Sequence, residues 1–210
     1  MVRSVRDIRK DEITDAVLEM LVEKGPAALN TRAVAEHISM SKASLYQHFD
    51  SLEEILMASV DKLHGRIDAL IRRAEQVCQS PLDTLYLLSK EVPTVTTLIA
   101  AFLNLRSHSG PQSGTWTTDL EERKRRFGAY LHSIMQRLVA DGQTRDDLTA
   151  DDLSVLFKRL HRGVAMERAE REIDQDFDTE AKIAQAWDLF CRAALKRDVY
   201  RPDKAGTHLE

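Results

Sequence analysis

Apolar residues recur every three or four positions along most of this chain, which is the spacing of one face of an α-helix. Between residues 7 and 24, for example, Ile13, Val17 and Leu21 share a face, and charged residues fill most other positions. No segment shows the strict apolar–polar alternation that is typical of a β-strand. The pattern therefore predicts an all-α protein with about nine helices. They are expected at residues 7–24, 32–38, 42–48, 52–78, 80–91, 95–106, 118–141, 149–170 and 179–197.

Composition excludes several classes of protein. The 210 residues contain no run of about 18 apolar residues, so neither a transmembrane helix nor a membrane partner is expected. The N-terminus lacks the apolar core of a signal peptide. The two cysteines, Cys78 and Cys191, are too few for a disulfide framework or a zinc cluster. These observations predict a cytoplasmic protein with reduced thiols.

No motif predicts a cofactor, a metal or a catalytic centre. Glycine-rich nucleotide-binding loops are absent, and the histidines lack the Glu-x-x-His or His-x-x-x-His spacing of helical metal sites. Ser107 and Ser109 flank His108, but the Gly-x-Ser-x-Gly elbow of a hydrolase is missing. We therefore expect a binding protein rather than an enzyme, with no cofactor and no metal.

Two short helices, at residues 32–38 and 42–48, are separated by only three residues, which is the spacing of a helix-turn-helix. Good helix caps precede both: Thr31 before the first and Ser41 before the second, and Asp50 and Ser51 offer a cap for the helix that follows. The second helix carries many hydrogen-bonding side chains, and only Leu45 and Phe49 are expected to face a core. Such a helix is suited to contacts with DNA phosphates and base edges.

The stretch from Thr31 to Phe49 resembles the tetracycline-repressor (TetR) family of transcriptional regulators. Its most specific part is Leu45-Tyr46-x-His48-Phe49, which follows Ser41-Lys42. The resemblance implies an all-α homodimer with an N-terminal DNA-binding domain and a variable C-terminal domain that binds a small effector. It divides the chain into a helix-turn-helix domain at 1–51, a helical effector-binding and dimerisation domain at 52–200, and a polar tail at 201–210.

The resemblance also implies roles for individual residues. Thr31 would touch a phosphate, Arg32 would read a base edge, and Tyr46 and His48 would clamp phosphates. The complete predicted DNA-binding set is Thr31, Arg32, Ser41, Lys42, Ala43, Ser44, Tyr46, Gln47 and His48. Three positions depart from the family pattern: Ser39 stands for the usual turn glycine, Met40 for a smaller β-branched residue, and Leu52 for a lysine that often contacts phosphate.

Charge gives only modest support for DNA binding. Residues 1–50 hold seven basic and eight acidic groups, a net charge of −1, and the whole chain carries −4. Nucleic-acid-binding domains are usually strongly basic. The prediction therefore depends on distribution, because most acidic residues lie on the first helix, whereas basic ones lie on the N-terminal arm and the second short helix.

Two predictions concern the C-terminal domain. A largely apolar effector pocket is expected between helices 52–78 and 149–170, entered near residues 107–117. Its predicted lining is Phe102, Arg106, Trp116, Tyr130 and His161. The last two helices are expected to pair with their symmetry mates through Leu153, Phe157, Leu160, Val164, Ile183, Trp187 and Phe190. Both sets have a plainer interpretation, which is that they only fill the core of one chain.

The sequence thus predicts a homodimeric repressor that binds a palindromic operator in double-stranded DNA and is released by an unidentified small molecule. Two alternatives stay open. One is an all-helical enzyme with residues 107–117 as a lid. The other is an architectural or division-regulating DNA-binding protein that needs no small molecule.

Overall fold

The structure is a computed structural model that describes residues 5–24, 28–92, 115–170 and 178–200. These residues form eight helices and no strand, which confirms the predicted all-α fold. A single bridge, between Thr144 and Leu195, is the one strand-like pairing in them. The helices are α1 (Val5–Lys24), α2 (Thr31–His37), α3 (Lys42–Tyr46), α4 (Leu52–Val77), a helix at residues 81–92, α6 (Thr115–Ala140), α7 (Ala150–Glu170) and α8 (Thr179–Ala194).

Two of the predicted segments differ from the structure or fall outside it. Helix α6 begins at Thr115 rather than at residue 118, so Trp116 lies in a helix and not in a loop. The predicted helix at 95–106 and most of the predicted 107–117 loop lie outside the described residues.

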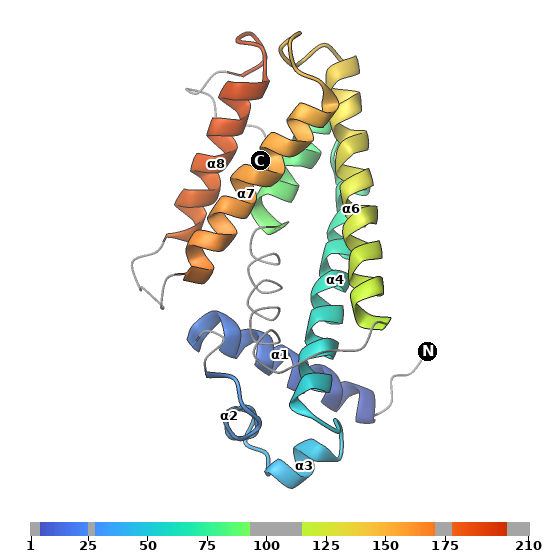
Figure 1. The fold of residues 1–210 in the computed structure, drawn as a ribbon, viewed down its shortest axis with the longest axis vertical. Helices are drawn as coiled ribbons and strands as arrows, with labels where there is room; N and C mark the ends of the chain where they lie inside the picture. The colour runs from blue at the N-terminus through green and yellow to red at the C-terminus, as the bar shows by residue number, and fades with distance from the viewer. Residues whose placement is uncertain (1–4, 25–27, 93–114, 171–177, 201–210) are drawn as a thin grey trace.

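The molecule is elongated, and its two ends have different roles in the fold (Figure 1). Helices α2 and α3 form one tip, and α1 crosses the adjoining part of α4. Helix α4 then runs along the long axis toward the other end, where α6, α7 and α8 gather. One long helix therefore connects the two ends.

Several helices begin with a side chain that caps their first turn, as the sequence predicted for Ser51. The Ser51 hydroxyl accepts a hydrogen bond from the Glu54 amide at 3.1 Å, and the Glu54 carboxylate accepts one from the Asp50 amide at 2.7 Å. This exchange satisfies two amides that a helix start otherwise leaves without partners. It fixes where α4 begins.

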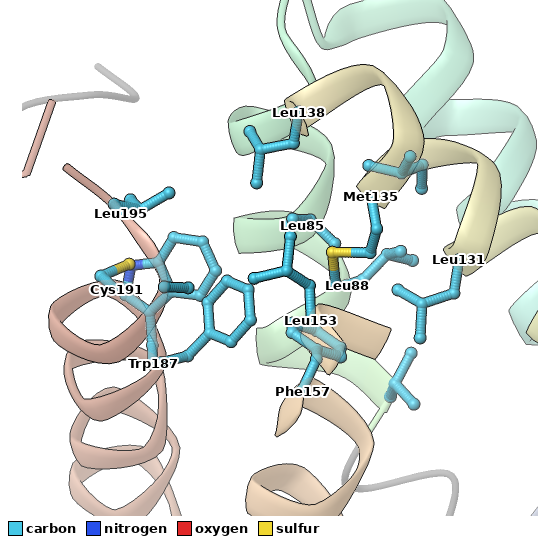
Figure 2. Close-up of a cluster of buried hydrophobic side chains, with 14 of the residues drawn as sticks. Leu85, Leu88, Leu131, Met135, Leu138, Leu153, Phe157, Trp187, Cys191 and Leu195 are labelled. Atoms are coloured by element: carbon cyan, nitrogen blue, oxygen red, sulfur yellow. The ribbon is translucent and has the colours of Figure 1, made fainter. Parts of the chain in front are cut away.

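Two larger clusters of buried apolar side chains hold the helices together, and α4 contributes to both. The N-terminal cluster joins α1, α2 and α3 to Ile55, Val60 and Leu63 of α4. The C-terminal cluster joins Leu70 of α4 to the helix at 81–92 and to α6, α7 and α8 (Figure 2). The predicted domain boundary at 51/52 falls at the start of α4, whereas the N-terminal core extends along that helix to Leu63.

The residues predicted for a dimer interface are mostly buried inside one chain. Leu153, Phe157 and Phe190 are at most 2% exposed within the C-terminal cluster, and Trp187 packs there as well (Figure 2). Val164 and Ile183 are buried in a third, smaller cluster, against which the partly buried Leu160 packs. These side chains close the core of the monomer, so an interface on α7 and α8 would need other residues.

Leu63 offers a test of the packing of α4. Leu63→Ala removes a side chain with no exposed surface and should lower the free energy of unfolding by about 2–5 kcal/mol, because it leaves a cavity. Val77→Ala, on the same helix but at a side chain that is 58% exposed, should change it by less than about 0.5 kcal/mol. Urea denaturation followed by circular dichroism measures both. Equal effects would contradict this packing.

Candidate DNA-binding surface and ligand pocket

The turn between α2 and α3 has a special backbone geometry at Ser39. Its φ of +54° lies in the left-handed region, and it is the one non-glycine residue there in the described part of the chain. The turn is closed by the Met40 amide, which donates to the Ala35 carbonyl at 2.8 Å. Ser41 then caps α3, as predicted, by accepting from the Ser44 amide at 3.0 Å.

The start of α2 corrects one prediction. Asn30, not Thr31, is the N-cap, and its side-chain oxygen accepts from the Ala33 amide at 2.9 Å. Thr31 is the first helical residue and is partly exposed. The signal was in the sequence, because asparagine is as good a cap as threonine or better and stood one position earlier.

Arg32 extends along the outside of α2. Its guanidinium lies 2.7 Å from the Glu36 carboxylate, one turn further on, and both side chains are largely exposed. The hydrogen bond that Arg32 donates to Glu36 raises the pKa of Arg32, which therefore stays positively charged. A pair this exposed contributes little to stability, so Arg32 can exchange Glu36 for another acceptor at low cost.

Helix α3 separates a buried face from an exposed polar one, as predicted. Leu45 and Phe49 are at most 2% exposed in the N-terminal cluster. On the other side, Ser41, Lys42, Ala43 and Gln47 are exposed, and Tyr46 is 43% exposed. The ammonium of Lys42 lies 5.8 Å from the centre of the Tyr46 ring.

His48 lies at the end of α3 and is partly buried. Its Nδ1 is shielded from solvent and has no hydrogen-bond partner in the described part of the chain. A shielded ring nitrogen without a partner is costly in a folded protein, and such groups often mark a binding role. The phosphate contact predicted for His48 remains a prediction.

Two acidic residues of α1, Asp11 and Asp15, face α4. Asp15 pairs with Lys62 at 2.7 Å and with Arg66 at 3.3 Å, and Asp11 pairs with Lys62 at 3.5 Å. Cations of α4 thus offset part of the negative charge of α1, which the net charge of residues 1–50 does not take into account. The polar face of α3 carries Lys42 and no acidic residue.

The structure contains a pocket of about 320 Å³ between α4, the end of the helix at 81–92, and α6. Its volume lies at the lower end of the range for small-molecule sites. The sequence predicted a pocket between α4 and α7, but no residue of α7 lines this one. Its lining is His64, Ile67, Asp68, Ile71, Val92, Arg123, Lys124, Arg126, Phe127 and Tyr130.

Of the predicted ligand-binding residues, only Tyr130 lines this pocket. Burial is the main reason that the pKa of Tyr130 is raised, so the side chain remains a neutral phenol. Phe102 and Arg106 lie outside the described residues, as does the side chain of Trp116. The helical spacing of Ile67 and Ile71 is that of any buried helix face and gives no sign that they face a cavity.

His161 is packed in the C-terminal core and is not among the lining residues of the pocket. It is 4% exposed, and its ring stacks on Phe157 with 4.1 Å between the ring centroids. Its Nδ1 lies 2.8 Å from the Phe157 carbonyl oxygen. Burial lowers the pKa of His161 and favours the neutral ring.

The described residues provide neither a metal-ligand cluster nor a membrane-spanning helix. They contain no group of three or more metal-ligating side chains. Among them there is also no helix long and apolar enough to cross a membrane.

Comparisons with known proteins agree with this geometry. The family model for bacterial regulatory proteins of the tetR family matches residues 13–58, which span most of α1, all of α2 and α3, and the start of α4. The HTH-type transcriptional repressor KstR2 of Rhodococcus jostii is 28% identical over 163 residues, covering 72% of this chain and 74% of the relative.

Solved structures share the whole fold. The ketosteroid transcriptional regulator KstR2 of Mycobacterium tuberculosis superposes with a TM-score of 0.67 at 19% identity, covering 94% of this chain and 98% of that one. AibR in complex with isovaleryl coenzyme A and operator DNA gives a TM-score of 0.61 at 15% identity, covering 88% and 97%.

The α2–α3 unit, its exposed polar helix and the helical remainder define a DNA-binding transcription regulator of the helix-turn-helix type. The match of residues 13–58 to the tetR family model, together with the similar repressors and solved structures, supports a TetR-family regulator.

The left-handed residue in the turn generates a prediction. Ser39→Gly should raise the free energy of unfolding by up to about 1 kcal/mol, because glycine adopts positive φ without the steric penalty of a Cβ. Ser39→Ala keeps that penalty and should give no gain. Urea denaturation compares the two variants with the parent chain, and a gain for alanine as large as for glycine would contradict the strain at Ser39.

Proposed function

We propose that the protein is a dimeric repressor whose α3 helices bind a palindromic operator and which a small molecule releases. The observation that carries the proposal is that α4 is shared by the two sites. Its first three turns pack under the helix-turn-helix, and its middle lines the pocket. A molecule in the pocket therefore touches the element that supports the DNA-binding tip.

The contacts of α4 suggest how the coupling operates. Asp61 pairs with Arg123 of α6 at 3.4 Å beside the pocket, and the next residue, Lys62, pairs with Asp15 of α1 at 2.7 Å. One turn of α4 is thus tied to α6 on one side and to α1 on the other. A ligand that changes the α4–α6 contact also changes the position of α1 and of the helix-turn-helix it packs against.

Release requires that the ligand binds one conformation better than the other, since only differential affinity shifts an equilibrium. A helix-turn-helix dimer must place its recognition helices about 34–36 Å apart to reach two successive major grooves. A small rotation of α4 in each protomer alters that distance. The AibR complex, which holds both an acyl thioester and operator DNA, is similar in fold and supports a two-site arrangement.

DNA contacts are assigned by chemistry. Tyr46 and His48 contact phosphates, which are identical at every base pair and so position the protein without reading sequence. Arg32, Lys42 and Gln47 reach base edges, where arginine can bind guanine and glutamine can bind adenine through two hydrogen bonds. The exposed Ala43 methyl can contact a thymine methyl, and Ser41, Ser44 and Thr31 add phosphate contacts near the two helix starts.

The assignment predicts two kinds of variant. Tyr46→Phe and His48→Ala should weaken binding about equally on operator and mismatched DNA. Arg32→Ala and Gln47→Ala should each cost about 1–3 kcal/mol at one base position per half-site and relax the preference there. Competition binding measures this on a duplex selected from a random pool, with every half-site position substituted.

Phosphate contacts should be few, because Leu52 stands where the family pattern that the motif resembles has a lysine. The slope of log affinity against log salt should correspond to roughly four to six phosphates per dimer. Base-specific loss for Tyr46→Phe together with uniform loss for Arg32→Ala would reverse the assigned roles.

Dimerisation is proposed through apolar side chains that α7 and α8 leave exposed. Val155 and Met166 lie three turns apart on one face of α7 and are 45% and 44% exposed. Leu189 of α8 is 48% exposed. These replace the buried residues that the sequence analysis selected for the interface.

Sedimentation tests the interface. At micromolar concentration the protein should sediment with about twice the mass of one chain, since a stable interface buries more than about 1,000 Å². Leu189→Glu places a charge in that interface and should shift the equilibrium to the monomer. Val77→Glu, at an exposed valine of α4, is the control and should remain a dimer. A monomeric parent chain would rule out the operator geometry.

A further inference from the structure

The chemistry of the pocket indicates what kind of molecule it binds. Much of its lining is apolar, with Ile71, Phe127 and Tyr130 among the side chains that form it. Three cations of a single turn of α6 line it as well: Arg123, Lys124 and Arg126. Asp68 is the one carboxylate among the lining residues. The lining is thus apolar in one part and carries a formal excess of two positive charges in another.

The three cations differ in the ion pairs that they form with carboxylates of the chain. Arg123 pairs with Asp61 at 3.4 Å, and Lys124 pairs with Glu121 at 2.8 Å within the exposed surface of α6. Arg126 is exposed and forms no ion pair in the described part of the chain, and the Glu122 carboxylate, which pairs with Arg125, interacts with it only at longer range. Its guanidinium is therefore the cation best placed to take an anion, and guanidinium groups bind carboxylates and phosphates through two parallel hydrogen bonds.

We propose that the pocket binds an apolar chain that ends in an anionic group, with Arg126 and Arg123 at the anion and Phe127 and Ile71 along the chain. The inference rests on the proposed function, in which this pocket is the effector site. The anionic group can be the carboxylate of a free acid or the phosphates of an acyl thioester, and both share the same recognition by Arg126.

The volume of the pocket limits the chain length. About 320 Å³ is the liquid volume of about ten water molecules, so the pocket accommodates about ten non-hydrogen atoms. Octanoate has that size. Its neutral analogue is 1-octanol, its cationic analogue is octyltrimethylammonium, and octanoyl coenzyme A carries the same chain on a phosphorylated carrier.

Titration calorimetry of the full chain with these four probes tests the proposal. Octanoate or octanoyl coenzyme A should bind at least tenfold more tightly than 1-octanol and octyltrimethylammonium. Arg126→Gln should weaken that binding about tenfold or more, because it removes a charge-assisted hydrogen bond, and should leave the affinity for 1-octanol unchanged.

The neighbouring residue provides a matched control. Arg125 lies on the same turn and is exposed, but it pairs with Glu122 at 2.6 Å and does not line the pocket. Arg125→Gln removes the same charge and should leave the affinity for the anionic probe within twofold of the parent value. Binding of octanoate points to a free acid, and binding of octanoyl coenzyme A alone points to a thioester.

Three outcomes would overturn the proposal: equal binding of 1-octanol, preferred binding of octyltrimethylammonium through Asp68, or equal losses for Arg125→Gln and Arg126→Gln. Operator binding, measured separately on the selected duplex, distinguishes this failure from failure of the proposed function. If octanoate binds tightly and the duplex stays bound, the ligand class is supported and the effector role is rejected. If the protein binds the operator but neither anionic probe, DNA recognition is supported and the ligand class is rejected.

Discussion

The whole structure depends on the packing of α4 in two hydrophobic cores. Ile55, Val60 and Leu63 belong to the N-terminal cluster, and Leu70, two turns after Leu63, belongs to the C-terminal one. An α-helix is stiff over this length, because each residue adds a backbone hydrogen bond to the same rod. A shift of its middle is therefore transmitted to both ends. This gives a physical basis for coupling a pocket to a DNA-binding surface.

The DNA-binding tip needs that support. Helix α3 has five residues, far fewer than the 12–15 that give even a marginal helix in isolation. Its conformation is held by the Ser41 cap and by Leu45 and Phe49, which anchor it to the N-terminal cluster. Its exposed side chains, Lys42, Ala43 and Tyr46, are then available for contact with another molecule. Lys10 adds to the anchoring by lying 4.6 Å from the Phe49 ring centre and 3.4 Å from Glu54.

The pocket is likewise built from helix faces that also serve the fold. Its apolar lining is continuous with the helix faces that build the C-terminal core, while its cations come from the exposed side of α6. An amphipathic ligand matches both surfaces at once. Arg123 lines the pocket and also pairs with Asp61 of α4, so in the proposed complex one arginine would serve both ligand recognition and the contact between α4 and α6.

The sequence by itself determined the features that depend on local patterns. These are the helices, the helix-turn-helix, the caps at Ser41 and Ser51, and the inward direction of Leu45 and Phe49. Each depends on residues within about one turn of one another. The tertiary structure decided the rest: that Tyr130 lines the pocket and His161 does not, that Asp11 and Asp15 face α4, and that Phe157 and Phe190 fill the monomer core. An apolar stripe has the same spacing whether it covers its own core, a cavity or a partner, and only the packing of distant helices distinguishes these cases.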